Sequence, residues 1–322
     1  MYNNFLKPAT LKDLQAELLG LLKIIDKVCR ENNIEYWLHA GTLLGAVRHG
    51  GYIPWDDDID ICVPAGDYQR LISALDAESK VNKNIFLYFE HATKPKSAHL
   101  RFEKLATTKM VMQRGKKVFS CYVDIFPSRI INKADKEKDQ NIANIIGIFS
   151  SSVTLNDAKI DSKYIKNTLK SALVEKQRFT QYFHSEYLPN CNDRAADSLV
   201  MTDDIYYPYA DIFPLQEMNF EGLKCLVPNN VENYLSADFG DYMTLPPKSE
   251  RVPKHSGLLY FCNSNQFALE STTATLSKEM QSFYRHPIQR YFKKLIKNFT
   301  IYNKMKNWDK NRRARKYVKK SH

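Results

Sequence analysis

Residues 37–60 read WLHAGTLLGAVRHGGYIPWDDDID, and this stretch decides the fold. A strand at 34–39 is expected to lead into Gly41 and Thr42, where the chain turns into a short helix. A glycine pair and a proline then break that helix. The alternating run 58–63, DIDICV, predicts a strand whose acids all face one side. The succession is therefore a strand, a glycine-hydroxyl turn, a short helix and an acidic strand.

The acidic strand predicts a site for a hard cation. Asp58 and Asp60 are separated by one residue, so their α-carbons lie ~6.5 Å apart on one face and both carboxylates can reach one Mg²⁺. A third carboxylate, Asp124, lies between apolar residues on a later predicted strand, where it could ligate the metal or accept a proton. By the same alternation Asp56 is expected behind the metal ligands, whereas Asp57 is expected to point into solvent.

Gly41 and Thr42 suit the binding of a phosphate. A strand-to-helix turn presents backbone N–H groups and the positive end of a helix dipole to an anion. A glycine-hydroxyl turn, an acidic D-x-D strand and a later strand acid follow in the order typical of the nucleotidyltransferase fold. The sequence therefore predicts an α/β (α+β) fold, with a nucleotidyltransferase-like mixed sheet and surrounding helices.

The whole segment 37–60 resembles the signature of the LicD family, which includes bacterial phosphocholine transferases and is related to fukutin and fukutin-related protein. The resemblance covers about residues 10–257. Further matching segments are VDIFP at 123–127, FEG at 220–222, VP at 227–228, FGDYM at 239–243, LPP at 245–247, and the single residues Arg251 and His255.

This resemblance implies an enzyme that transfers phosphocholine from CDP-choline to a sugar hydroxyl, with release of CMP. The acceptor would be a lipid-linked or cell-surface glycan or a teichoic acid precursor. Asp58 and Asp60 would hold Mg²⁺, or Mn²⁺, against the diphosphate, and Asp124 would ligate metal or take the acceptor proton. Transfer of glycerol phosphate or ribitol phosphate, nucleotidyl transfer, and a non-enzymatic membrane- or nucleic-acid-binding module are the alternatives.

Five further residues are candidates for binding the donor. Arg48 and His49 follow the turn, although two basic groups also commonly end an exposed helix. Lys104 could reach a phosphate, or could belong to a half-exposed strand of alternating charge. Arg251 and His255 are candidates through the family resemblance.

Four aromatic residues bracket the acidic segment, namely Tyr36, Trp37, Tyr52 and Trp55. Aromatic rings can cage a quaternary ammonium group such as that of choline. Buried packing is the more common role of such rings. We therefore expect these four side chains to lie in the core.

Length and composition fit a compact globular chain. The 322 residues are 43% hydrophobic, which supports one large core or two modest ones. We expect a catalytic domain over 1–280 that contains a mostly helical insertion at 132–205. The six cysteines show no metal-binding spacing, so free thiols in a reducing cytosol are expected. The remaining predicted elements are helices at 11–28 and 68–75, strands at 85–90, 99–105 and 118–126, the last ended by Pro127, and a hairpin at 219–227.

The basic character of the chain belongs to its C-terminal tail, 281–322. Residues 285–322 hold fourteen Lys and Arg and one acid, a net charge of +13. The whole chain carries +11, so residues 1–284 carry −2. Apolar residues recur among these cations at helical spacing, which favours an interfacial helix on an anionic membrane over a nucleic-acid-binding arm or a solvated tail. No signal sequence or long apolar run is present, so we expect a cytoplasmic protein, peripheral on the inner face of the cytoplasmic membrane.

Overall fold

A computed structural model describes residues 5–91, 101–137, 198–202, 205–255 and 257–285. The strands are β1 (Leu6–Pro8), β2 (Trp37–Leu38), β3 (Asp60–Pro64), β4 (Ile85–His91), β5 (Arg101–Arg114), β6 (Lys117–Asn132), β7 (Ser198–Thr202), β8 (Ile205–Pro208), β9 (Gln216–Phe220), β10 (Leu223–Val227) and β11 (Leu258–Cys262). The helices are α1 (Leu11–Glu31), α2 (Ala40–His49), α3 (Ala65–Val81), α7 (Tyr209–Ile212), α8 (Val231–Phe239) and α9 (Asn265–Arg285), with short 3-10 turns η1 (Lys133–Asp135) and η2 (Lys248–Glu250).

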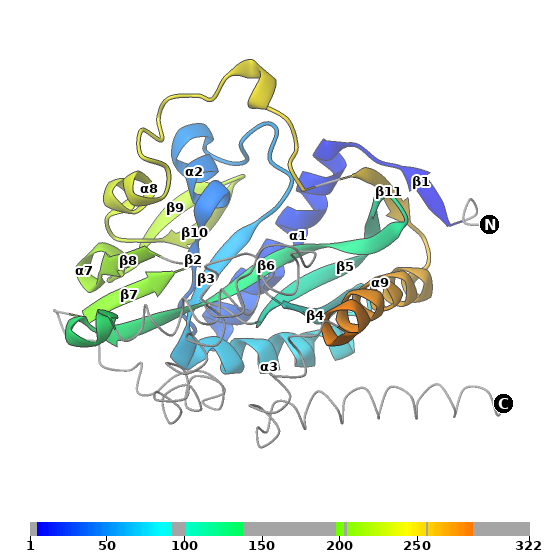
Figure 1. Cartoon of the computed structure of the whole chain (residues 1–322), viewed down its shortest axis with the longest axis horizontal. Coiled ribbons are helices and arrows are strands. Elements are labelled where there is room, and N and C mark those ends of the chain that lie inside the picture. The colour runs from blue at the N-terminus through cyan, green and yellow to red at the C-terminus, as the bar shows by residue number, and fades with distance from the viewer. Residues whose placement is uncertain (1–4, 92–100, 138–197, 203–204, 256, 286–322) are drawn as a thin grey trace.

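A nine-stranded sheet forms the centre of the described residues, in the order β1-β11-β5-β6-β3-β2 (Figure 1). Strand β4 also pairs with β5, and β7 and β8 continue from the far end of β6. Strands β3 and β6 run parallel, and the other pairs of this sheet are antiparallel. The predicted mixed sheet with surrounding helices is therefore confirmed.

Helices cover both faces of this sheet. Along β5, Met110 and Met112 belong to the main core, whereas Val111 packs with Ala268 of α9 in a separate cluster. Because successive strand residues point to opposite faces, α9 lies on the face opposite to the main core. Helices α1 and α3 contribute to the main core and cover the other face (Figure 1).

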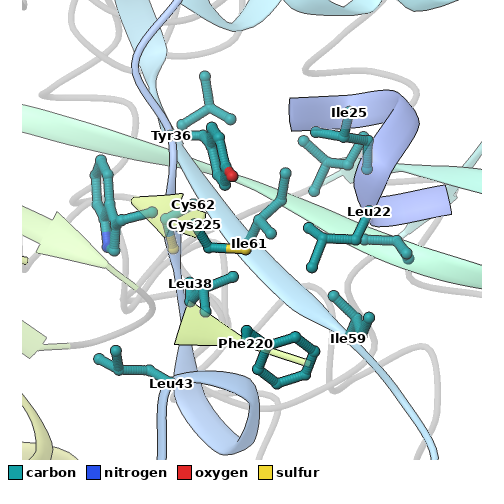
Figure 2. Packing of buried hydrophobic residues seen from close by; sticks show 14 of the residues in the cluster. Leu22, Ile25, Tyr36, Leu38, Leu43, Ile59, Ile61, Cys62, Phe220 and Cys225 are labelled. Carbon is teal, nitrogen blue, oxygen red and sulfur yellow. The ribbon is translucent and has the colours of Figure 1, made fainter. Parts of the chain in front are cut away.

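Helix α1 follows the predicted pattern. Thr10 and Asp13 form a capping box, in which the Thr10 hydroxyl accepts from the Asp13 backbone and the Asp13 carboxylate accepts from Thr10. Its apolar stripe packs against β3 and the β9–β10 hairpin, so that Leu22, Ile61 and Phe220 share one cluster (Figure 2). Truncating a fully buried leucine such as Leu22 to alanine would cost about 2–5 kcal/mol.

Several predicted boundaries are wrong. The two strands on either side of α2 are shorter than predicted: β2 covers only Trp37–Leu38, and β3 begins at Asp60, which leaves Asp58 in the preceding loop. Pro127 does not end β6. It is aligned with Val63 of β3, between the last residue of β6 that pairs with β5 and the first that pairs with β7. Proline has no backbone N–H, but at this position β6 pairs with neither β5 nor β7, so no hydrogen bond to those strands is lost.

The predicted hairpin turning at Glu221 and Gly222 is confirmed. The predicted free thiols are also confirmed for the five described cysteines, all of which are buried. Most of the predicted insertion and of the basic tail lies outside the described residues, and α9 runs across the predicted boundary at residue 280. Among the described helices, none combines the length and the apolar character needed to cross a membrane.

Candidate active site

Three charged residues lie side by side on neighbouring strands. Asp60, the first residue of β3, is aligned with Asp124 of β6, which is in turn aligned with Lys104 of β5. Lys104 is 2% exposed and Asp124 9% exposed, and the Lys104 Nζ lies 2.5 Å from Asp124 Oδ1 and 3.6 Å from the centre of the Tyr122 ring. Of the two readings of Lys104, the half-exposed strand is wrong, because this lysine is buried and pairs with Asp124.

Two more carboxylates interact in the loop before β3. Burial raises the pKa of Asp56 to about 7, with a further contribution from the neighbouring charge of Asp58. Burial alone would raise the pKa of Asp58 as well, but the hydrogen bond and the charge of His255 outweigh it, and this pKa is lowered. Asp56 therefore keeps its proton through the mildly acidic range, up to about pH 7, whereas Asp58 is ionised there.

His255 is the partner of Asp58. Its Nδ1 lies 2.5 Å from Asp58 Oδ2, and this hydrogen bond raises the pKa of the imidazole. The imidazole therefore carries a positive charge over a wider pH range than a free histidine does. The contact brings together residues that are 197 positions apart in the sequence.

Asp57 is buried, so the prediction that it points into solvent is wrong. It is 3% exposed, and its two oxygens accept backbone N–H groups, from His255 at 2.8 Å and from Lys254 at 3.3 Å. Asp57 thus connects the segment before β11 to the acidic loop, residues 56–59, which leads into β3. Ligand atoms of Asp57, Asp58 and His255 all lie within 4.8 Å of one another, a grouping that could hold a metal ion.

The first turn of α2 holds the acids in place. The Thr42 hydroxyl accepts the backbone N–H of Asp60 at 2.9 Å. A Cβ on Gly41 would stand 3.0 Å from Asp56 Oδ2, an atom that is buried without a hydrogen-bond partner among the described residues. The glycine at position 41 therefore makes room for the Asp56 carboxylate.

His49 and Arg251 lie against Trp55 instead, and Arg48 lies near Arg251. The Arg251 guanidinium lies 5.6 Å from the centre of the Trp55 ring, and the His49 ring meets the same indole edge-on at 6.4 Å. Arg48 donates to the Tyr242 carbonyl at 2.8 Å. Burial, followed by the charge of Arg251, lowers the pKa of Arg48. Two arginines thus stand close enough to repel each other, next to the acidic loop.

The predicted site residues therefore fall into two neighbouring groups. The acidic group holds Asp58, Asp60, Asp124, Lys104 and His255, with Gly41 and Thr42 at its edge, and the basic group holds Arg48, His49 and Arg251. The core prediction is confirmed for Tyr36, Trp37 and Tyr52, which are buried, while Trp55 is partly exposed within the basic group.

Sequence reasoning missed two residues that support the site. Gln15 of α1 donates from Nε2 to the Asp56 carbonyl at 2.9 Å, and Glu221 of the hairpin accepts the Tyr52 N–H at 3.1 Å. The helical pattern of α1 gave no sign that Gln15 contacts the acidic loop. The match of Phe220-Glu221-Gly222 to the family was the one available signal for Glu221.

Comparison with known proteins agrees with this geometry. Residues 33–144 match the family model described as LicD/FKTN/FKRP, nucleotidyltransferase domain. The chain is 27% identical over 263 residues to the lipopolysaccharide cholinephosphotransferase LicD of Haemophilus influenzae, covering 78% of this chain and 97% of that protein. It is 41% identical over 58 residues to the human ribitol 5-phosphate transferase FKRP, which is 17% of this chain and 12% of FKRP. An uncharacterized protein of Rickettsia typhi is 36% identical over 103 residues, 27% of this chain and 33% of that protein.

The matched segment 33–144 contains α2, the acidic loop, β3 and the Lys104 and Asp124 pair. The matched segment thus includes Asp58, Asp60, Asp124 and the turn at Gly41 and Thr42. His255, Arg251 and Glu221 lie beyond it. Residues 33–144 of this chain therefore resemble the nucleotidyltransferase domain of the LicD/FKTN/FKRP family.

Proposed function

We propose that this protein is a phosphotransferase that moves phosphocholine from CDP-choline to a sugar hydroxyl of a cell-surface glycan precursor, with release of CMP. The relatives with named activities are transferases of phosphate-containing groups, and one of them acts on lipopolysaccharide. The observation that carries the proposal is the convergence of Asp58, Asp60 and Asp124 beside Lys104 and His255, next to the basic group. Acids beside cations suit a metal-bound diphosphate.

The donor set fits a hard divalent cation. Carboxylate oxygens are the preferred ligands of Mg²⁺, and Asp56 Oδ2 is a buried oxygen with no hydrogen-bond partner in the described part of the chain. Asp58, Asp60 and Asp124 would hold the ion, Mg²⁺ or alternatively Mn²⁺. Bound there, the cation would neutralise charge on the diphosphate. Asp57, Asp58 and His255 form the alternative ligand set, although Asp57 already accepts two backbone N–H groups.

The protein's own side chains suggest a division of labour. Lys104 would keep Asp124 ionised, so that this carboxylate can accept the proton of the attacking hydroxyl or share the metal. Arg48, Arg251 and His49 would bind the diphosphate, because two neighbouring guanidinium groups attract an anion. Protonated His255 would add a positive charge beside Asp58. Gly41 and Thr42 would bring the first turn of α2 close to a phosphate.

The match to the ribitol 5-phosphate transferase FKRP favours a second candidate, transfer of ribitol phosphate or glycerol phosphate from the corresponding CDP-alditol. The chemistry at the phosphorus would be the same, and only the contacts to the alcohol would differ. Nucleotidyl transfer to a small molecule keeps the fold with another leaving group, pyrophosphate.

We also propose that the protein works at the inner face of the cytoplasmic membrane, where a lipid-linked glycan would be presented. The basic composition of residues 281–322 supports attraction to anionic lipid. Binding to nucleic acid is the less favoured use of that charge.

The test is release of CMP in the presence of Mg²⁺ and a glycan precursor, with CDP-choline, CDP-glycerol and CDP-ribitol compared side by side. We expect the fastest release from CDP-choline, and its loss in Asp58→Asn and Asp60→Asn. Asp76→Asn is the matched control, because Asp76 is an exposed helical acid paired with Lys80. Activity in both site variants would refute the assignment, and pyrophosphate release from a nucleoside triphosphate would favour nucleotidyl transfer.

A further inference from the structure

The β9–β10 hairpin pairs with no strand of the large sheet and forms a two-stranded sheet of its own. Its turn residues Glu221 and Gly222 both have positive φ angles, 51° and 80°. Two successive residues of this kind form the tight turn whose twist matches an antiparallel hairpin. A non-glycine residue in the left-handed region is uncommon, which directs attention to what Glu221 contacts.

The tip of the hairpin binds the backbone just before the acidic loop. The Glu221 N–H donates to the Gly50 carbonyl at 3.1 Å, and the Asn219 side-chain amide donates to the same oxygen at 3.2 Å. In the opposite direction, the Tyr52 N–H donates to Glu221 Oε1 at 3.1 Å. Three hydrogen bonds thus fix the segment from Gly50 to Tyr52.

Close packing holds this segment on both sides. A Cβ on Gly51 would stand 2.1 Å from Glu221 Oε1, and a Cβ on Gly45 of α2 would stand 2.4 Å from the Gly51 carbonyl oxygen. Neither position has room for a side chain. The backbone of Gly51 is therefore held between helix α2 and the carboxylate of Glu221.

A chain of contacts leads from this segment to the acids. The Tyr52 ring meets Phe220 edge-on with centroids 4.9 Å apart, and its hydroxyl donates to the Gln15 carbonyl at 2.8 Å. The Gln15 side chain in turn donates to the Asp56 carbonyl at 2.9 Å. A shift of Tyr52 would therefore be passed to Asp56 through Gln15 and along the three intervening residues.

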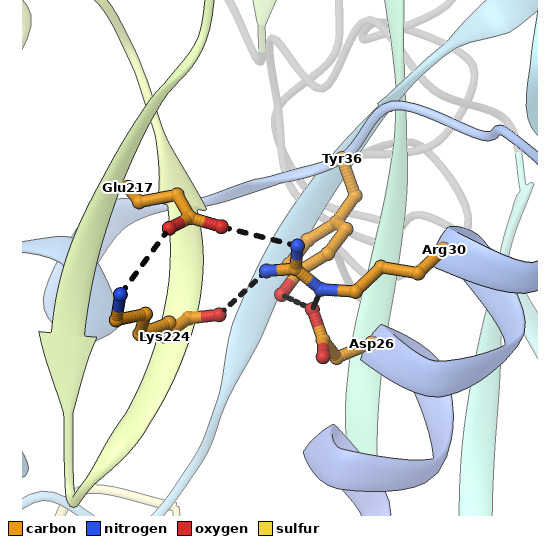
Figure 3. Close-up of polar contacts among 5 residues, drawn as sticks. All are labelled: Asp26, Arg30, Tyr36, Glu217 and Lys224. Atoms are coloured by element: carbon orange, nitrogen blue, oxygen red, sulfur yellow. Dashed lines mark hydrogen bonds and ion pairs between the residues drawn. The ribbon is translucent and has the colours of Figure 1, made fainter.

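The base of the hairpin is fixed by other contacts. Arg30 of α1 donates to the Lys224 carbonyl at 2.8 Å and pairs with Glu217 at 3.1 Å and with Asp26 at 2.8 Å (Figure 3). The Tyr36 hydroxyl donates to the same oxygen of Asp26. The base thus attaches the hairpin to α1, while the tip contacts the loop that leads to the acids.

We infer that the β9–β10 hairpin is a brace for the acidic loop and that Glu221 is its positioning residue. By holding Gly51 and Tyr52, Glu221 sets the place from which the chain continues to Asp56 and Asp58. Glu221 touches no reacting group itself. The inference deepens the proposed function, on which it rests for the role of the acids.

The test compares Glu221→Ala with Glu217→Ala in the full-length protein. Both remove a glutamate from the same hairpin, one at the tip and one at the base. Two readouts are taken: the dissociation constant of Mn²⁺ alone, and deuterium uptake by the amides of residues 50–58. We expect Glu221→Ala to weaken Mn²⁺ binding roughly 10- to 100-fold, as for other residues that orient metal ligands, and to increase deuterium uptake.

Glu217→Ala should leave both readouts near those of the wild type. Glu221→Gln should do the same, because its side-chain oxygen still accepts the Tyr52 N–H. If Glu221→Ala fails to fold, Glu221→Asp withdraws the carboxylate by one methylene and takes its place. Wild-type uptake and affinity in Glu221→Ala, or equal losses in Glu217→Ala, would overturn the inference. If the wild type binds no Mn²⁺, the metal assignment fails while deuterium uptake still decides the brace.

Discussion

Replacing Lys104 by methionine is the most informative single perturbation. The Lys104 side chain is 3% exposed and that of Asp124 is 12% exposed, with 2.5 Å between Nζ and Oδ1. Methionine keeps an apolar stem of similar length, so the main change is the loss of the positive charge. Removing one partner of a buried ion pair costs about 3–5 kcal/mol, since the other charge stays buried without compensation. We expect a loss of that size in the free energy of unfolding.

The measurement is urea unfolding at pH 7 in EDTA, so that no divalent cation replaces the lysine. Adding Asp124→Asn to Lys104→Met should recover much of the loss, because the uncompensated charge is then gone. The deficit of Lys104→Met alone should shrink as the pH falls, since a protonated carboxyl is less costly to bury. Lys80→Met, at an exposed pair, is the control and should cost no more than about 1 kcal/mol. The reasoning would be refuted by losses of similar size in Lys104→Met and Lys80→Met. Additive losses in the double variant Lys104→Met, Asp124→Asn would also refute it.

Three other predictions concern the acidic loop. The pKa of Asp56 is raised to about 7, so the folded state keeps a proton that the unfolded state releases from about pH 4. The melting temperature in EDTA should therefore fall as the pH rises from 4 to 7. Asp56→Asn should flatten that decline. Asp57→Ala leaves the N–H groups of residues 254 and 255 unpaired and should cost about 1–3 kcal/mol by urea unfolding; an unchanged midpoint would contradict this. Gly41→Ala places a Cβ against Asp56 Oδ2. It should lower the rate of CMP release strongly and the melting temperature only slightly.

Local patterns predicted much of the fold. The sequence showed the capping pair and apolar stripe of α1, the turn of the hairpin, and the places of Asp60 and Asp124 on strands, because each depends on neighbouring residues or on alternation. The alignment of Asp60 with Asp124 and of Asp124 with Lys104 was not, because pairing between strands is a property of register rather than of composition.

Errors arose where a distant segment decides the environment. Asp57 was predicted to be solvated from its place in the alternation, yet the backbone of residues 254–255 covers it. Lys104 lies among charged residues that suggest an exposed strand, yet β6 supplies its partner. In both cases tertiary contacts override the local pattern, as they commonly do at charged sites.

The hydrogen bonds from Lys254 and His255 to Asp57 also set an order of events during synthesis. The acidic loop and β3 leave the ribosome almost two hundred residues before the segment that covers them. Contacts between such distant segments form late, because a long loop must close first. A nascent chain that has reached residue 250 therefore carries every predicted carboxylate ligand but lacks His255 and the cover over Asp57. The predicted site is complete only once residue 255 has been made, so shorter nascent chains do not present it.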